Sequence, residues 1–193
     1  MILSDKTLKR LIVEEKLIDT PQVYVGPSSI DLTLANDFSW PWPLDGTLDF
    51  RRYDQGDTIA PCEHSGAKVQ DYFLLQPRGF VLGSTQEVVH LPENISAMIQ
   101  GRSSVARLGL QVHAAAGYID AGFKGRITLE LSNLTDYAMK LPVGLPICQL
   151  ICFQQDEASA EPYIGRYQFQ YKATPTRLNV LPPEEGKVYP DDE

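Results

Sequence analysis

The chain has few cysteines, and they follow no pattern that would bind a transition metal. Its 193 residues include three cysteines, an odd number that gives no disulfide framework. Cys148 and Cys152 do not have C-x-x-C spacing, and the three histidines form no H-x-E or H-x-x-x-H pair. The spacing therefore does not support a zinc site. We expect Cys148 and Cys152 to be small buried side chains.

The sequence also lacks a long apolar run and an excess of positive charge. No apolar stretch approaches the roughly 20 residues that a membrane-spanning helix needs. Charged residues begin at Asp5 and Lys6, which argues against a signal peptide. The formal net charge of −8 predicts a surface that repels nucleic acid, and a free nucleotide fits it better than duplex DNA does. We therefore expect a cytoplasmic protein that binds neither a membrane nor nucleic acid.

Short strand patterns separated by prolines and glycines fill most of the chain. At 193 residues it is long enough for one buried core and too short for two ordinary domains. Strand patterns lie at 29–34, 72–75, 80–82, 87–91, 97–100, 110–113, 127–131 and 147–153. Many short strands at nearly regular intervals predict a mainly β fold, an antiparallel jelly-roll or β-barrel.

Helical signals are confined to two places. Ser4 or Asp5 can cap a short N-terminal helix, and residues 102–108 can form one further turn. Residues 39–66, which include two prolines next to tryptophans, predict a long irregular excursion between strands. From Thr174 onward the chain is proline-rich and acidic, a composition typical of a mobile tail.

Three chemically distinctive pieces lie between Gly101 and Ser132. The turn at 102–107 can direct serine hydroxyls, backbone N–H groups and two arginines at phosphate oxygens, although such turns are also common on surfaces. The loop 117–125 holds three glycines around Asp120, which can bind a sugar hydroxyl, orient a water molecule or only close an Asx-turn. Together the pieces indicate a site for a phosphorylated small molecule.

The third piece is the strand at 127–131, whose alternation leaves two readings of Glu130. Thr128, Glu130 and Ser132 share the polar face of this strand. Glu130 is a solvated side chain if that face looks outward, and a candidate general base if the face lines a pocket. The aromatic and cationic residues of 163–172 are likewise either ordinary surface or a flap that orders over an anionic ligand.

Seven segments together resemble the dCTP deaminase family, which belongs with the trimeric dUTPases. They are M-I-L-S-D at 1–5, P-S-S-I-D-L at 27–32, G-F-V-L-G-S-T at 79–85, G-R-S-S-V-A-R-L-G-L at 101–110, V-H-A-A-A-G-Y-I-D-A-G-F-K-G at 112–125, I-T-L-E-L at 127–131 and A-T-P-T-R at 173–177. The resemblance extends to Asn179. It implies one dUTPase-like catalytic domain over 1–179, a distorted jelly-roll with a short N-terminal helix, and an acidic tail over 180–193. It also implies a homotrimer with sites shared between subunits.

The resemblance also implies a reaction, in which dCTP is deaminated without zinc at the base. Glu130 would activate the attacking water, Ser103 and Arg107 would hold the water and the reacting end of the base, and Asp120 would meet the deoxyribose. Mg²⁺ would be carried with the triphosphate, and no protein side chain would bind it. The implied substrate-binding residues are Arg102, Ser103, Ser104, Val105, Ala106, Arg107, Asp120, Thr128, Leu129, Glu130, Gln149, Tyr163, Arg166 and Gln170.

Gly117 and Tyr118 bear on the product. The loop 117–125 is similar to the dUTPase loop G-x-I-D-x-x-Y-x-G, whose aspartate positions water for phosphoryl attack, and bifunctional members carry glycine at the place of Gly117. This favours release of dUMP, ammonia and pyrophosphate over a deaminase that stops at dUTP. A nucleotide sensor without activity and a dUTPase proper are the remaining alternatives. Ala115 stands where many relatives have threonine, and Arg166 where they have lysine, which bears on dTTP as a candidate inhibitor and on phosphate geometry.

Overall fold

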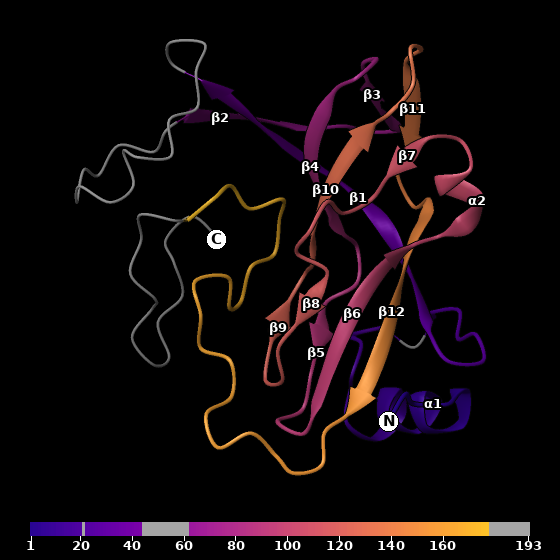
Figure 1. Cartoon of the computed structure of the whole chain (residues 1–193), viewed down its shortest axis with the longest axis vertical. Helices are drawn as coiled ribbons and strands as arrows, with labels where there is room; N and C mark the ends of the chain where they lie inside the picture. The colour runs from indigo at the N-terminus through magenta and orange to yellow at the C-terminus, as the bar shows by residue number, and fades with distance from the viewer. Residues whose placement is uncertain (21, 44–61, 178–193) are drawn as a thin grey trace.

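The structure, a computed structural model, describes residues 1–20, 22–43 and 62–177. The predicted 180–193 tail lies outside these residues. The described part is mainly β with two helices, which confirms the predicted fold class (Figure 1). The elements are α1 (Asp5–Glu14), β1 (Ile30–Pro43), β2 (Cys62–Lys68), β3 (Tyr72–Leu75), β4 (Phe80–Thr85), β5 (Val89–His90), β6 (Ile95–Gly101), α2 (Ser103–Ala106), β7 (Leu110–Gln111), β8 (Tyr118–Ile119), β9 (Lys124–Gly125), β10 (Thr128–Asn133), β11 (Met139–Pro142) and β12 (Pro146–Gln154).

Eight of the strands form one antiparallel sheet. Its order is β7-β10-β4-β1-β12-β6-β8, and β2 pairs with the outer half of β1. Two small ladders, β11-β3 and β5-β9, complete the described strands. Several neighbouring strands, such as β1 and β12, are far apart along the chain. The loop after β8 and the chain after β12 lie in one region of the molecule (Figure 1).

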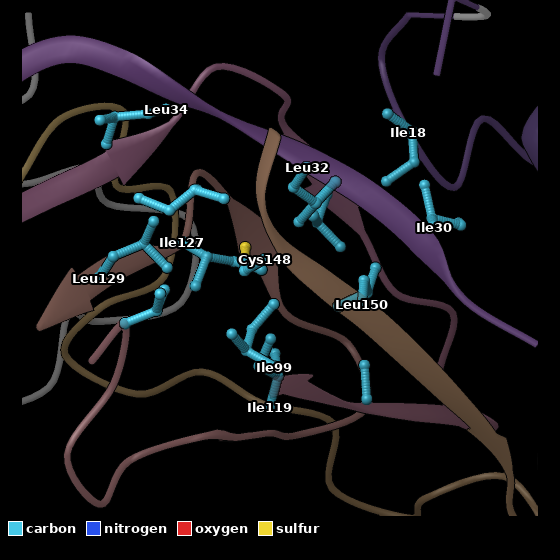
Figure 2. Close-up of a cluster of buried hydrophobic side chains, with 14 of the residues drawn as sticks. Ile18, Ile30, Leu32, Leu34, Ile99, Ile119, Ile127, Leu129, Cys148 and Leu150 are labelled. Carbon is cyan, nitrogen blue, oxygen red and sulfur yellow. The ribbon is translucent and has the colours of Figure 1, made fainter. Parts of the chain in front are cut away.

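Alternation along the strands builds the core. Ile30, Leu32 and Leu34 of β1 are fully buried, and they gather with side chains of β6, β10 and β12 in one apolar cluster (Figure 2). On β10 the buried residues are Leu129, Leu131 and Asn133, so Thr128 and Glu130 must point the other way. Each fully buried Leu or Ile contributes about 1.5–3 kcal/mol, so this interleaving is the main force that closes the sheet.

The N-terminal helix is confirmed and lies near the end of β12 (Figure 1). Leu8, Leu11 and Ile12 are its buried residues. Ser4 occupies the N-cap position, but its side chain makes no capping hydrogen bond. In the part of the chain that the structure describes, neither helix is long or apolar enough to cross a bilayer.

The prediction of an irregular excursion over 39–66 is wrong at both ends. Strand β1 continues to Pro43, and β2 pairs with it from Pro43 opposite Cys62 to Asp37 opposite Lys68. Prolines misled the prediction, because a proline cannot donate to a ladder. Pro41 and Pro43 are two residues apart, so their nitrogens share one side of the strand, and beyond Ser39 the described partner of β1 is β2 alone. Residues 44–61 lie outside the described part.

Candidate active site

A cavity of about 400 Å³ opens between β10, the loop around Asp120 and the segment that follows β12. Thr128 and Glu130 of β10 line it, as do His113 and Asp120 from the chain between β7 and β9. The segment after β12 closes it with residues between Tyr163 and Thr176. Three parts of the chain that the sequence analysis had singled out separately therefore meet in one hollow.

The structure places Glu130 on the cavity side of its strand. Its side chain is half-buried, and its Oε2 accepts hydrogen bonds from the backbone amides of Ala114 at 2.8 Å and Ala115 at 3.4 Å. Two backbone donors on one oxygen fix the position of the carboxylate. Of the two alternatives for Glu130, the structure agrees with the one in which the polar face of the strand lines a pocket.

The glycines of the loop permit close approaches, as their spacing predicts. Gly122 has φ +86°, and a Cβ there would lie 2.6 Å from Pro162 Cβ. A Cβ on Gly117 would lie 3.0 Å from His113 Cε1 and 3.1 Å from the Ile99 carbonyl oxygen. The loop can therefore hold the chain after β12 on one side and the His113 ring on the other.

Asp120 lies on the same loop with its side chain exposed toward the cavity. The Asp120 carbonyl accepts a hydrogen bond from the Phe123 amide at 3.3 Å, which closes the turn through the backbone. No hydrogen bond found among the described residues joins the Asp120 carboxylate to its own loop. The Asx-turn alternative is therefore not the arrangement observed, and the carboxylate faces the cavity.

The segment 163–170 is fastened to β9 and its flanking loop. The Tyr163 ring lies 5.9 Å from that of Phe123, between centroids. Gln168 accepts from the Lys124 amide at 2.8 Å and donates to the Gly122 carbonyl at 3.0 Å. Gln170 donates through Nε2 to the Arg126 carbonyl at 2.9 Å. Tyr163, Tyr167 and Gln170 of this segment line the cavity.

The prediction of a tail that begins at Thr174 is wrong for residues 174–177. Thr174 is 4% exposed and Arg177 8% exposed. Arg177 donates through Nη1 to the Arg166 carbonyl at 2.8 Å, and its amide donates to the Tyr167 hydroxyl at 3.1 Å. Composition gave the wrong answer because a few buried polar contacts, rather than apolar side chains, hold these residues.

The predicted phosphate-binding residues form a second group. Arg102, α2 and Arg107 do not line the cavity, and Val105 points into the core. Arg102 Nη2 lies 3.4 Å from Asp31 Oδ2, and Gln149 Nε2 donates to Asp31 Oδ1 at 3.2 Å. The single chain thus holds the Glu130 and Asp120 carboxylates in the cavity and the cationic turn outside it. Asp31, which the sequence analysis had not singled out, joins the members of the second group.

Several of the remaining predicted residues have mixed placements. Tyr118 lines the cavity and is exposed, whereas the Leu129 side chain is fully buried in the core, so only its backbone can face a ligand. Arg166 does not line the cavity. Sequence reasoning missed His113 and the residues 174–176 as lining groups, although both lie in segments that carried the family resemblance.

Known proteins share sequence with most of this chain. Residues 2–155 match a family model described as dCTP deaminase-like. The chain is 39% identical to "dCTP deaminase, dUMP-forming" of Dictyoglomus thermophilum, with 93% of this chain and 96% of the relative covered. It is 40% identical to the protein of the same description from Methanosphaerula palustris, over 80% of this chain and 82% of that one.

A solved structure shares the fold. The dCTP deaminase of Agrobacterium tumefaciens superposes with a TM-score of 0.58 at 20% identity, over 78% of this chain. The chain spans about half of that longer protein, 47% of its length. At this level of identity the likeness shows the fold alone.

Proposed function

This chain belongs to the dCTP deaminase-like family, and we propose that it converts dCTP and two water molecules into dUMP, ammonia and pyrophosphate. The relatives described as dUMP-forming cover more than nine-tenths of the chain in the strongest matches. The observation in the structure that carries the proposal is the Glu130 carboxylate, held by two backbone amides inside a cavity of nucleotide-compatible size.

In the proposed deamination, Glu130 acts as the general base. It takes a proton from a water molecule that attacks C4 of the cytosine ring and delivers this proton to N3. It then takes the proton of the new C4 hydroxyl and transfers it to the amino group, which leaves as ammonia while the C4 carbonyl forms. The Ala114 and Ala115 amides occupy Oε2, which leaves Oε1 as the oxygen that faces the water. The backbone of 128–130 reads the pyrimidine edge, because the Leu129 side chain is buried on the far face of β10.

Hydrolysis of the triphosphate is assigned to the loop around Asp120. The Asp120 carboxylate is exposed to the cavity, where it can hold the deoxyribose and orient a second water molecule. Gly117 keeps this loop in close contact with His113, and Tyr118 lies beside it. The segment with Tyr163 and Gln170 covers the nucleotide.

Mg²⁺ is proposed to arrive on the triphosphate, where it would neutralise phosphate charge. Within the described ranges no three His, Cys, Asp or Glu side chains cluster in a way that could hold a metal ion. In this proposal the phosphate oxygens of the nucleotide are the ligands of the ion.

The site is proposed to be completed by a second copy of the chain, in a homotrimer. Arg102, Ser103 and Arg107 are needed near the phosphates and the reacting base, yet they do not line the Glu130 cavity of their own chain. Ser103 and Arg107 are exposed, which leaves them available to a neighbouring subunit. The reaction belongs to nucleotide metabolism, and we expect it in the cytoplasm, with dTTP as a candidate inhibitor.

One experiment tests the assignment of Glu130 and of the product. Glu130→Gln keeps the side-chain volume but removes the base, so ammonia release from dCTP should fall by about 10²–10⁴-fold while dCTP binding survives. Deamination at a near-normal rate in this variant would overturn the assignment. Chromatography of wild-type products decides the rest: dUMP and pyrophosphate are expected, whereas accumulating dUTP would indicate the monofunctional enzyme. Binding of dCTP without turnover would indicate a sensor.

A further inference from the structure

Strand β1 carries an irregularity that redirects one acidic side chain. Leu34 pairs with Thr85 and Phe38 pairs with Gly83, so residues 35–37 of β1 lie opposite Ser84 alone. Extra residues in one strand of a pair disturb the ladder and turn side chains away from their regular face. Asp37, the last of these residues, is consequently aimed into the protein and is 7% exposed.

The Asp37 carboxylate is surrounded by donors. The Ser84 hydroxyl lies 2.9 Å from Oδ1 and 3.0 Å from Oδ2, the Ala173 amide donates to Oδ2, and Arg126 Nη1 lies 3.7 Å from Oδ1. A buried carboxylate needs such partners, since burial without them is costly. Ser84 and Arg126 belong to the sheet and its border, whereas Ala173 belongs to the segment after β12. Asp37 therefore ties that segment to the sheet.

The next amide of the segment is held by the neighbouring strand. Ser84 of β4 lies opposite Thr128 of β10, and the Thr128 hydroxyl accepts a hydrogen bond from the Thr174 amide at 3.4 Å. Side chains of β1 and β10 thus accept hydrogen bonds from two consecutive amides, those of Ala173 and Thr174. Residues 174–176 then line the same cavity as Glu130.

We propose that Asp37 is a positioning residue for nucleotide binding: it anchors the backbone at Ala173 so that residues 174–176 close the cavity. Asp37 does not line the cavity and acts only through the segment. The nucleotide as ligand rests on the proposed function. Anchoring of the segment does not, because it follows from contacts within the protein.

Asp37→Ala removes the anchor, and Glu87→Ala is its matched control. Glu87 is also a buried carboxylate, 6% exposed, and accepts hydrogen bonds from the Thr33 amide at 2.9 Å and the Thr33 hydroxyl at 2.7 Å. None of these contacts involves residues 163–177. Both variants should lose stability, so a difference between them isolates the effect on the segment.

The first readout is amide hydrogen exchange in the nucleotide-free protein. In Asp37→Ala the amides of 163–177 should exchange about tenfold faster or more, while β6 and β12 change no more than in Glu87→Ala. Equal exchange of 163–177 in both variants would overturn the proposal. Should Asp37→Ala fail to fold, Asp37→Asn serves instead. It keeps an oxygen for the Ala173 amide and loses the charge, so we expect the amides of 163–177 to exchange faster than in the wild type, but by less than in Asp37→Ala. Exchange at the wild-type rate would contradict the anchor.

The second readout is steady-state kinetics with dCTP. Loss of closure should raise KM about tenfold while kcat for ammonia release stays within about twofold, because the segment contributes binding rather than chemistry. A lower kcat with unchanged KM would contradict a positioning role. If the wild-type protein released no ammonia from dCTP, the proposed function would fail, and the exchange experiment would still decide whether Asp37 holds the segment.

Discussion

At the scale of single residues, Gly117 connects backbone geometry to the choice of product. A methyl group at this position would meet His113 Cε1 at 3.0 Å, Nδ1 at 3.2 Å and the Ile99 carbonyl oxygen at 3.1 Å. These contacts are tighter than ordinary packing allows, so the loop or the ring must move by a few tenths of an ångström. Asp120 lies three residues further along the same loop.

We expect Gly117→Ala to impair hydrolysis of the triphosphate more than deamination. Small misplacements of a water-positioning group cost about ten- to a hundredfold in rate. Glu130 is held from Ala114 and Ala115 and should lose less. The measurement is the ratio of dUTP to dUMP in product chromatography, which should rise by roughly tenfold.

Gly66→Ala is the control for this substitution. Gly66 lies on β2, where an added Cβ would meet only the Phe38 carbonyl oxygen, at an ordinary 3.4 Å. Its product ratio should equal that of the wild type. If Gly117→Ala also left the ratio unchanged, Gly117 would have no influence on hydrolysis of the triphosphate.

The two buried cysteines predict how stability changes in alkali. Burial raises the pKa of the Cys152 thiol to about 12, and burial, with a smaller influence of Glu87 and Asp31, raises the pKa of Cys148. Both thiols stay neutral in the folded protein at pH values where the unfolded chain already ionises them. Their full stabilisation is thus present below about pH 8.5 and declines toward pH 12, by up to about 1.4 kcal/mol per pH unit and thiol.

Urea unfolding at pH 7 and pH 10 measures this contribution. Cys152→Ala removes one of the two thiols, so the loss of unfolding free energy between the two pH values should be about 1–2 kcal/mol smaller than in the wild type. The comparison within each protein cancels the cavity that the substitution leaves. Identical losses in both proteins would show that the thiol ionises in the folded state.

The sequence pattern predicted which way a side chain points better than it predicted which residues surround that side chain. Alternation placed Thr128 and Glu130 on one face and Leu129 on the other, as observed. It could not show what covers that face, because the Ala114 and Ala115 amides that reach Glu130 lie 16 and 15 residues away along the chain, in the irregular stretch between β7 and β8. Asp37 was missed for a related reason, since its direction depends on pairing between β1 and β4.

At the scale of elements, the loop around Gly122 is where the chain after β12 joins the rest. Gly122 has φ +86° and contacts Pro162, whereas Gly144 has φ +80° and nothing within 4 Å of an added Cβ. Both positions therefore require a positive φ, but an added Cβ would meet neighbouring atoms only at Gly122.

We expect Gly144→Ala to lower unfolding stability by about 1–2 kcal/mol through backbone strain alone. Gly122→Ala should cost about 1–3 kcal/mol more, because residues 162 and 163 must move. Thermal denaturation measures both, at about 2–4 °C per kcal/mol for a chain of this size. Only Gly122→Ala should also raise KM for dCTP, since Tyr163 lines the cavity. Equal losses in the two variants would show that the contact with Pro162 contributes nothing.

Elements were predictable where local pattern and tertiary pairing agree. The helix α1, the turn α2 and strands such as β3 and β12 follow from periodicity over a few residues. The outer half of β1 and its partner β2 do not, because prolines and glycines hide a pairing that only the folded ladder reveals. Residues 174–177 belong to the same class, because Thr174 is held by Thr128 of β10 and Arg177 by Arg166 and Tyr167.

At the scale of the whole molecule, one chain separates the acidic cavity from the cationic turn. Glu130 and Asp120 line the cavity, while Arg102 is paired with Asp31 next to Gln149. If neighbouring copies supply the missing half, each site uses Glu130 of one subunit and Arg107 of the next. In such a shared site, two variants that are each inactive can complement each other, which a site within one chain does not allow.

Two inactive variants should restore activity when they assemble together. We expect Glu130→Gln and Arg107→Ala each to lose deamination as separate proteins. Co-expressed at equal amounts with different affinity tags, they form mixed trimers in which about a third of the sites, one in each trimer, combine an intact Glu130 with an intact Arg107. Mixed trimers purified through both tags should release ammonia from dCTP at a comparable fraction of the wild-type rate, whereas the same variants mixed after separate assembly should not. Mixed trimers without activity would place both residues in one chain's site, because every such site would then carry one of the two lesions.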